Sequence, residues 1–460
     1  MGTTSEKEYK INEPLIHVGV IQKQQIIDFS LLTSYKLKGE KIPPGNYFVQ
    51  IKEGKIYFNG DCYDELTFES DQLHNDRFEL KNVIIGIGFH WERKENQQFL
   101  GGLKFICTEG DSDSDSDSSK TITAINIISL EDYLKSVISS EMSSTSSEEL
   151  LKAHAIISRS WLLSQVLYNK SNRNKQSDYN SSIVTSTEII RWYDRDDHEH
   201  FDVCADDHCQ RYQGITRQNT ELVDRVVNET IGKVVSYRGS ICDTRYSKCC
   251  GGIMETFENV WEPLIHPYLQ GKPDNYSGHP FPNLCEEEEA DKWIKSSPDA
   301  FCNTQDAGVL KQVLNDYDQE TVDFYRWNIR YTQKELSELI NNRIGIDFGN
   351  IIDLVPIERG VSGRIILLKI IGTEKVMIIG KELEIRRTLS KSHLYSSAFT
   401  VETFDEDDEG IPQRFILTGA GWGHGVGLCQ IGAAVMADKG YKYDEILKHY
   451  FPGTDIKTKY

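Results

Sequence analysis

The sequence predicts an α+β protein, with a mixed core domain of buried helices and short strands and a small N-terminal β module. Two observations support this class. Residues 13–109 contain short β-rich segments separated by turns such as Pro43–Asn46, whereas residues 345–460 alternate strands with helices. Between them, residues 129–163 show apolar side chains at helical spacing. Strands and helices that occupy different parts of a chain are typical of α+β architecture.

The chain of 460 residues is long enough for two or three domains. We expect a β-rich module over residues 1–110, an acidic Asp/Ser loop over 111–120 and one large domain over 121–460. A charged, helical insertion is expected near 286–335. The run Asp111–Ser118 is too polar to form a core and is expected to be solvated, and it lacks the glycine and distal glutamate of an EF-hand calcium loop.

Individual elements follow from the same patterns. The strands expected in the N-terminal module are Leu15–Ile21, Tyr47–Ile51, Lys55–Phe58, Phe78–Ile87 and Leu103–Cys107. Near the C-terminus we expect strands Ile365–Ile371, Val376–Ile379 and Phe415–Leu417 and helices over 430–438 and 443–450.

The overall charge limits the class of partner. The chain has 71 acidic and 51 basic residues, a net charge of −20 and a pI near 5.1. An acidic surface repels phosphate groups, which argues against nucleic acid and anionic membrane surfaces as partners. No apolar run of about 18 residues exists, so no transmembrane segment is expected. The first residues, Met1–Glu8, are polar and contain no signal-peptide core.

A carboxylate continues the apolar face of the first predicted helix. Ser129 is a plausible N-cap for a helix that runs to Met142. The apolar face of this helix is formed by Leu130, Leu134, Val137 and Ile138. At about 100° per residue, Glu141 lies on the same face. A carboxylate there is either paired or kept partly protonated by desolvation, and a protonated carboxylic acid is what general-acid catalysis requires. The alternative is a Glu at the helix end that points to solvent.

The second predicted helix carries two polar residues in an apolar surrounding. Ser146 and Glu149 have the spacing of a capping box, and the following segment is apolar on more than one face, which is typical of a central, buried helix. His154 and Arg159 lie inside it. A buried arginine needs an anionic partner, and Glu141 is one candidate. Such an ion pair would lower the pKa of Glu141 rather than raise it.

Glycine recurs at every second position from residue 419 to 427. The pattern fits neither the dinucleotide fingerprint nor the P-loop. It leaves one face of the chain without side chains, so that backbone or sugar can approach closely, while Trp422 and His424 lie on the other face. We consider two interpretations, a sugar-binding groove and tight backbone packing around a structural histidine.

Ten cysteines in 460 residues do not form a disulfide-dense scaffold. Cys204 and Cys209 are separated by four residues and have three histidines nearby, which is a tolerable spacing for zinc. If zinc binds, we expect a structural site of His198 or His200 with Cys204 and Cys209. The alternatives are a disulfide or free thiols. The pair Cys249–Cys250 is more consistent with structural cysteines than with a nucleophile, because no histidine partner is evident.

Three blocks of this sequence resemble the stage II sporulation protein D family, which shares its domain with amidase-enhancer proteins of the bacterial cell wall. The blocks span Leu130–Trp161, Ser247–Leu269 and Gly421–Thr454 and follow the order of the family. The chain departs from the family pattern at three positions, where Ser143 replaces Pro, His154 replaces Gln and Cys429 replaces Ser. None of these departures removes Glu141.

The resemblance implies a lytic transglycosylase that cleaves the MurNAc–GlcNAc bond of peptidoglycan glycan strands and leaves 1,6-anhydro-MurNAc ends. Glu141 is then the single catalytic acid and base. The expected substrate contacts are Arg159, Ser247, Trp422, Gly423, His424 and Gly425. The segment around Cys204 and Cys209 also has a counterpart in the family, where some members use it for metal. No cofactor is expected to be required, and a structural zinc stays open as one alternative for this segment.

Two other functions stay open. One is a non-catalytic glycan-binding enhancer of a cell-wall amidase, and the other is a hydrolytic glycosidase that leaves reducing ends. Expected partners are glycan strands and other cell-wall hydrolases or amidases. The substrate places the protein in the cell envelope or periplasm, while the polar first residues keep a cytoplasmic location open.

Overall fold

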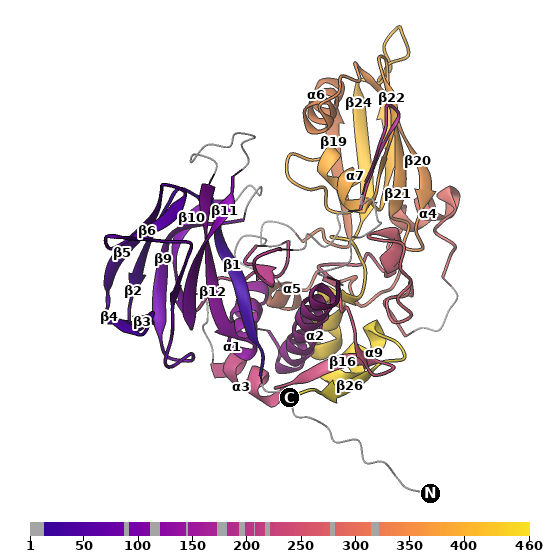
Figure 1. The fold of residues 1–460 in the computed structure, drawn as a ribbon. Coiled ribbons are helices and arrows are strands. Elements are labelled where there is room, and N and C mark those ends of the chain that lie inside the picture. Colours follow the sequence, from indigo (N-terminus) through magenta and orange to yellow (C-terminus); the bar gives the residue numbers. More distant parts are fainter. Residues whose placement is uncertain are drawn as a thin grey trace, which may run out of the picture.

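The computed structural model describes residues 13–86, 92–110, 120–143, 146–172, 182–192, 198–206, 208–216, 221–276, 281–313 and 322–460. The acidic run Asp111–Ser118 lies outside these ranges. The structure confirms the α+β class, and its elements gather around three main hydrophobic cores (Figure 1).

Two sheets form the N-terminal module. One is five-stranded, in the order β15-β1-β12-β11-β8, and the other is six-stranded, in the order β10-β9-β2-β5-β6-β7. The strands are β1 Leu15–Gln24, β2 Ile26–Leu31, β5 Gly45–Lys52, β6 Lys55–Phe58, β7 Asp61–Tyr63, β8 Glu65–Phe68, β9 Arg77–Ile85, β10 Arg93–Leu100, β11 Gly102–Glu109, β12 Lys120–Ser129 and β15 Val203–Cys204. A hairpin of β3 Tyr35–Leu37 and β4 Glu40–Ile42 adds to them. All five strands expected from sequence are present.

Aromatic side chains fill the core of this module. Phe29 is 1% exposed and packs on Phe68 and Phe105 with ring centroids 5.3 and 5.1 Å apart. Alternation of apolar and polar residues along each strand turns the rings inward. Strand β12 belongs to this module and continues directly into helix α1 at Ser129. The module is therefore joined to the central helices without an intervening loop.

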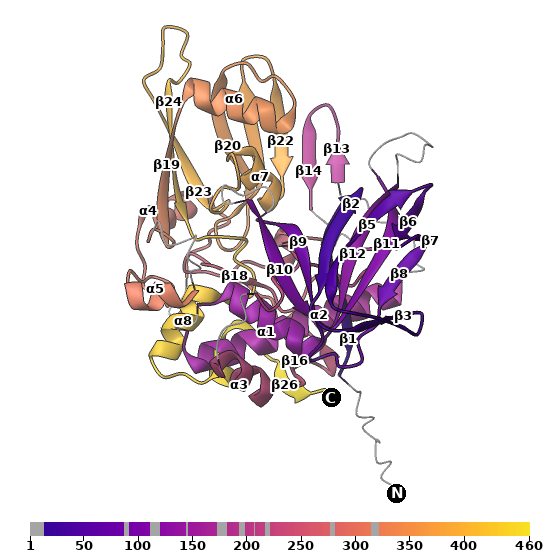
Figure 2. The same cartoon turned by 90° about the vertical axis from the view of Figure 1, so that its left-hand side faces the viewer.

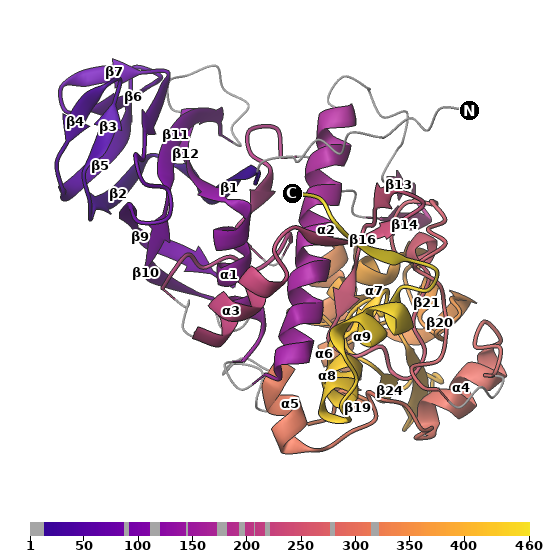
Figure 3. The same cartoon turned by 90° about the horizontal axis from the view of Figure 1, so that it is seen from below.

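Helices dominate the central part of the molecule. Helix α2 runs through it, beside α1, α3 and the C-terminal helices (Figure 3). The elements are α1 Leu130–Glu141, α2 Glu148–Asn172, α3 Glu221–Glu229, α5 Ala307–Val313, α8 Gln430–Asp438 and α9 Tyr443–Tyr450. Short strands border them, namely β16 Lys233–Tyr237, β17 Ser240–Ile241, β26 Asp455–Thr458, β18 Tyr246–Ser247 and β25 Leu428–Cys429. The prediction that α2 is central and buried is confirmed.

A third lobe is built from two further sheets (Figure 2). A five-stranded sheet has the order β13-β14-β22-β21-β20, and a three-stranded sheet has the order β19-β24-β23. Their strands are β13 Ser182–Val184, β14 Glu188–Arg191, β19 Arg326–Thr332, β20 Ile351–Arg359, β21 Ile365–Gly372, β22 Val376–Gly380, β23 Phe399–Phe404 and β24 Arg414–Ala420. The helices of this lobe are α4 Glu287–Lys295, α6 Gln333–Ile344 and α7 Glu382–Thr388. The C-terminal strands and helices expected from sequence are all present.

Two details differ from the sequence interpretation. The N-terminal contact of α2 is made by Ser147, whose Oγ accepts a hydrogen bond from Leu150 N at 3.4 Å, while Ser146 Oγ donates to backbone carbonyls instead. Glu149 accepts a hydrogen bond from Tyr443 N at 2.8 Å, so the expected capping box of Ser146 and Glu149 does not form.

The segment expected as a charged helical insertion, 286–335, contains helices α4 and α5 and strand β19 in its described residues. Helix α4 and strand β19 both pack against β24, with β19 as an edge strand of its sheet, whereas α5 packs on α8. Within the described ranges, no helix combines the length and apolar character that crossing a membrane requires.

Candidate active site

Glu141 is the last residue of helix α1. Ser129 caps the helix start by accepting a hydrogen bond from Asp132 N at 3.3 Å, and the four apolar residues of its inner face are fully buried. Glu141 itself is half-buried. Its Oε1 accepts a hydrogen bond from the backbone N–H of Arg211 at 3.3 Å. The carboxylate thus sits where the buried face of the helix meets solvent, so it is neither sealed in the core nor extended into water.

The buried arginine of α2 binds a different carboxylate. Arg159 is 0% exposed, and its Nε and Nη2 donate to the two carboxylate oxygens of Glu131 at 2.9 and 2.6 Å. Glu131 also accepts from Gly232 N at 3.2 Å and from the Tyr460 hydroxyl at 2.5 Å. Glu131, and not the other candidate Glu141, is therefore the ion-pair partner of Arg159. The structure also places Arg159 in the core as a structural residue, where it does not reach a bound glycan.

Helix α5 fixes the loop that follows Glu141. The backbone carbonyl of Gln312 accepts hydrogen bonds from Ser143 N at 3.1 Å and from Ser146 Oγ at 2.6 Å. The side-chain oxygen of the same glutamine accepts from Ser147 N at 2.9 Å. These three bonds hold the connection between α1 and α2, and therefore the helix end that carries Glu141.

The histidine- and cysteine-containing segment docks beside Glu141. Its strand β15 pairs with β1, and Asp202 accepts a hydrogen bond from His17 N at 2.9 Å. Gln213, two residues after Arg211, donates its backbone N–H to Ser136 Oγ at 3.2 Å. Because Arg211 N contacts Glu141, the conformation of this segment decides what surrounds the carboxylate.

Four side chains of the segment converge on one point. They are His198, Cys204, His208 and Cys209, whose ligand atoms all lie within 4.8 Å of one another. His198 Nε2 is 3.3 Å from Cys209 Sγ, and His208 Nδ1 is 3.8 and 3.6 Å from the sulfurs of Cys204 and Cys209. Tetrahedral zinc with its usual bond lengths separates such ligand atoms by about 3.3–3.8 Å. The donor set and spacing fit a structural zinc.

The structure corrects one of the expected ligands. His200 is 43% exposed and its ring faces Glu199, whereas His208 occupies the fourth corner of the cluster. The neighbouring Cys209 thiol and the imidazoles of His198 and His208 lower the pKa of the Cys204 thiol. The thiolate is the form of cysteine that binds metal.

The glycine-rich loop from 420 to 427 connects β24 to β25 and packs on buried polar side chains. Gly425 has a φ of +77°, and a Cβ at this position would collide with the guanidinium of Arg364. Arg364 is 1% exposed and donates to the carbonyls of Gly423 and Cys250. The glycines therefore allow tight packing of backbone against Arg364, the second of the two interpretations considered from sequence. Ser247 is also buried under this loop, beside Gly423.

Trp422 and His424 are partly buried on this loop. The indole of Trp422 lies between Phe324 and Tyr395, with ring centroids 4.7 and 4.3 Å away. The ring of His424 meets Trp261 edge-on at 4.8 Å. These contacts fix both rings, so each presents one constant edge to the surface.

Electrostatic surroundings keep His424 neutral. Burial of the ring, together with the positive charges of Arg245 and Arg364, holds its pKa well below the usual range. Its Nδ1 accepts a hydrogen bond from Val426 N at 3.0 Å, so the proton of the neutral ring is on Nε2. Arg245 stacks on Trp261 at 4.4 Å and pairs with Asp243, which joins these residues in one cluster.

Known proteins match this chain in two successive regions. A family model described as Stage II sporulation protein matches residues 118–237, and one described as a domain of unknown function (DUF8618) matches residues 255–427. The first region contains Glu141 and the His/Cys cluster, and the second contains Trp261, Arg364 and Trp422.

Three relatives illustrate the similarity. An uncharacterized protein of Brachyspira hyodysenteriae is 26% identical over 409 residues, covering 87% of this chain and 85% of its own. Stage II sporulation protein D of Bacillus amyloliquefaciens is 22% identical over 333 residues, covering 72% and 75%. The amidase enhancer of Bacillus subtilis is 24% identical over 248 residues, covering 51% of this chain and 32% of that protein. The match of residues 118–237 to the model described as Stage II sporulation protein, and the relatives of that name, confirm the resemblance of the motifs.

Sequence reasoning missed two residues that shape the site. Arg364 anchors the glycine loop, and its sequence context in β20–β21 gives no sign of a buried charge. His208 completes the metal cluster, and the signal that could have found it is its position directly before Cys209.

Proposed function

We propose that this protein is a cell-wall lytic transglycosylase that cleaves the MurNAc–GlcNAc bond of peptidoglycan glycan strands, with Glu141 as its single catalytic acid and base. The family match and the names of the relatives support the coarser statement, a role in processing the cell wall. We place its action in the cell envelope, where that substrate lies.

The position of Glu141 is the observation that carries this proposal. A catalytic carboxyl group must reach the substrate. The charge of the buried Arg159 is matched by Glu131, and Glu141 lies half-buried at the helix end. It contacts a backbone N–H of the segment that the His/Cys cluster shapes.

The reaction needs only this one carboxyl group. Glu141 donates its proton to the glycosidic oxygen as the bond from that oxygen to C1 of the muramoyl residue breaks. The C6 hydroxyl of the same residue attacks C1, and its proton passes to the Glu141 carboxylate, which restores the acid. No water is consumed, whereas a hydrolase generally uses two carboxylates on either side of the bond.

The aromatic cluster around the glycine loop supplies groups that suit a sugar chain. Trp422 and Trp261 offer flat apolar surface, and the ring of His424 packs edge-on against Trp261 at 4.8 Å. We include Trp422 and His424 in the glycan-binding surface. Gly423, Gly425 and Ser247 act beneath it by shaping the loop.

We further propose that His198, Cys204, His208 and Cys209 hold a structural zinc. The metal would fix the turn of residues 204–209 and with it the backbone of Arg211 beside Glu141. All four ligands come from protein, so no coordination position is left for substrate and the role is structural.

A second function is favoured by one specific similarity. The amidase enhancer of Bacillus subtilis matches half of this chain. A glycan-binding protein that stimulates a separate amidase would use the aromatic cluster and would not need the proton of Glu141.

The experiment that separates these functions is mass spectrometry of the products from purified glycan strands, with and without stem peptides. Wild type is compared with Glu141→Gln and with Glu338→Gln, a control whose side chain is 63% exposed on α6. We expect anhydro-muramoyl ends from wild type and from the control, and none from Glu141→Gln. Reducing ends would assign a hydrolase. Intact binding without cleavage in all three proteins would assign the enhancer function.

A further inference from the structure

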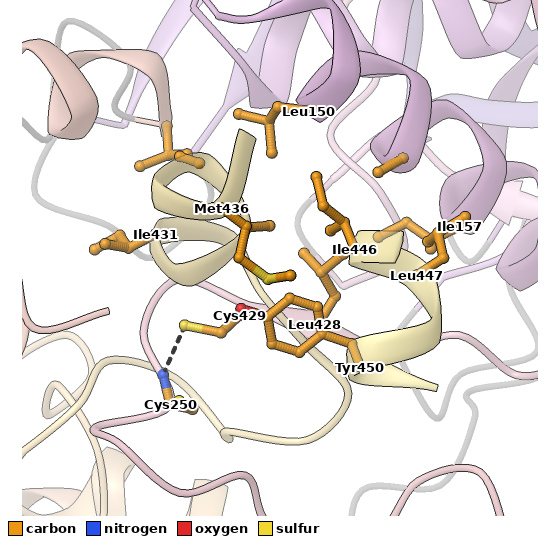
Figure 4. Close-up of a cluster of buried hydrophobic side chains, with 14 of the residues drawn as sticks. Leu150, Ile157, Cys250, Leu428, Cys429, Ile431, Met436, Ile446, Leu447 and Tyr450 are labelled. Carbon is orange, nitrogen blue, oxygen red and sulfur yellow. Dashed lines mark hydrogen bonds between the residues drawn. The ribbon is translucent and has the colours of Figure 1, made fainter. Parts of the chain in front are cut away.

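Three cysteines and an aspartate meet in the central core, far from the His/Cys cluster in sequence. They are Cys250, Asp274, Cys302 and Cys429, and their ligand atoms all lie within 4.8 Å of one another. Each of these residues is 0–2% exposed. They come from four separate segments, and Figure 4 shows Cys250 and Cys429 beside Tyr450 and the apolar side chains of α8 and α9.

The spacing of these atoms is that of a metal site. Cys250 Sγ is 3.5 Å from Cys302 Sγ. In a tetrahedral zinc site the sulfur and oxygen ligands are separated by about 3.6–3.8 Å, close to the observed value. The same spacing is much longer than the bond of about 2.0 Å in a disulfide.

The surrounding groups orient the donor atoms as outer-shell partners of a metal do. Cys250 N donates to Cys429 Sγ at 3.2 Å, Cys302 N donates to Asp274 Oδ2 at 3.0 Å, and the Tyr450 hydroxyl donates to Asp274 Oδ1 at 2.8 Å. Hydrogen bonds of this kind fix the direction of metal ligands and favour their anionic forms.

A buried histidine lies beside the carboxylate of this cluster. His449 is 3% exposed, and its Nε2 lies 3.4 Å from Asp274 Oδ1. Neither of its ring nitrogens has a well-aligned hydrogen-bond partner among the described residues. A polar side chain in a dry core is costly without a partner, and so is a carboxylate among thiols. A divalent cation would offset the charge of Asp274.

We propose that Cys250, Asp274, Cys302 and Cys429 form a second metal site, which binds zinc through three thiolates and one carboxylate. A ligand set rich in thiolate selects a borderline-soft ion such as zinc over magnesium or calcium. The site has no open position, so its role is to bind the four segments together. It fixes Cys429, the residue before α8, and Cys250, whose carbonyl accepts from the Arg364 that anchors the glycine loop.

Metal counting on the purified full chain tests the proposal. Zinc per chain is measured for wild type, for Cys302→Ser and for the matched control Cys242→Ser, which replaces a thiol that is equally buried and outside the cluster. We expect Cys302→Ser to lose about one zinc per chain relative to wild type and Cys242→Ser to lose none. In a Cys204→Ser/Cys209→Ser background the remaining zinc must still disappear on Cys302→Ser, which separates this site from the His/Cys cluster.

A second measurement identifies the ligand atoms directly and includes the unaltered chain. X-ray absorption of the zinc in the Cys204→Ser/Cys209→Ser protein, and of the zinc in wild type, reports the sulfur ligands. The proposal expects three sulfurs and one lighter atom at the second site. Equal zinc in Cys302→Ser and Cys242→Ser, or a Cys250–Cys302 disulfide in peptides mapped from the metal-free native protein, would overturn it.

Discussion

Arg159 and Glu131 form a bidentate ion pair inside the core, with nitrogen–oxygen distances of 2.9 and 2.6 Å. The pair joins α2 to the first turn of α1, and the Tyr460 hydroxyl and Gly232 N complete the bonding of the carboxylate. The pair matches the buried charge of α2 and lies at the opposite end of α1 from Glu141.

The first prediction concerns the stability that depends on this pair. Glu131→Gln leaves the Arg159 charge in the core without its counter-ion, and we expect a loss of about 3–5 kcal/mol in the free energy of unfolding. Urea unfolding followed by circular dichroism measures it. The control Glu141→Gln should change the free energy by less than about 1 kcal/mol, because its amide oxygen can still accept from Arg211 N. Equal losses in the two variants would show that the ion pair is not the dominant structural contact.

The second prediction distinguishes two histidines near Cys204 and Cys209, of which His208 belongs to the His/Cys cluster and His200 does not. His208→Ala should lose zinc from the His198, Cys204 and Cys209 site, since it removes one of four converging ligands. His200→Ala should retain the metal, because His200 lies outside the cluster. Zinc content after dialysis measures both. If the two variants keep equal zinc, His208 is not a ligand.

The third prediction tests the packing of the glycine loop. Gly425 and Gly410 have the same φ of +77°, but a Cβ at Gly425 would collide with Arg364, whereas nothing lies within 4 Å of a Cβ at Gly410. Both alanine variants bear the same backbone strain, of about 1 kcal/mol. We expect Gly425→Ala to lose a further amount of about 1–3 kcal/mol through overpacking. Thermal and urea unfolding measure the difference, and equal destabilisation would mean that Arg364 moves aside freely.

The fourth prediction is a pH dependence that arises from a buried histidine. Burial, with a smaller contribution from Lys248, lowers the pKa of His154 from 6.5 to about 3. Between these values the unfolded chain binds a proton that the folded protein does not. The free energy of unfolding therefore falls as pH falls below about 6.5, at up to about 1.4 kcal/mol per pH unit.

The variant His154→Gln removes this titration. Between about pH 7 and pH 5 it should lose about 2 kcal/mol less of its unfolding free energy than wild type does. Urea unfolding at both pH values gives the comparison. Parallel losses in the two proteins would contradict the assignment of His154 as a neutral core residue.

Periodicity explains which elements could be predicted from sequence. Helix α1 has an apolar face of period 3.6, α2 follows a long apolar segment and β21 is a run of apolar residues, so these elements could be predicted. Strands β3 and β7 are three residues long, and their existence depends on pairing with neighbours rather than on their own composition.

The residues of the candidate site also differ in whether they could be predicted from the sequence. Glu141 and the Cys204–Cys209 spacing could be recognised because the signal lies within a short stretch of sequence. The partner of Arg159 could not be recognised, because Glu131 lies 28 residues earlier in the chain. The rule that a buried arginine needs an anionic partner does not distinguish Glu131 from Glu141. The choice of His208 over His200 depends on how the loop folds back, which spacing alone does not determine.

The contacts of Gln312 connect the two regions of the chain that the two family models match. Gln312 lies in the region matched by the second family model, yet it holds the loop after Glu141, which lies in the region matched by the first. A carboxylate whose setting depends on both regions ties them into one inherited unit. Exchanging either region alone between relatives would remove the contacts of Gln312 with the residues that follow Glu141. The two regions are therefore expected to be inherited together.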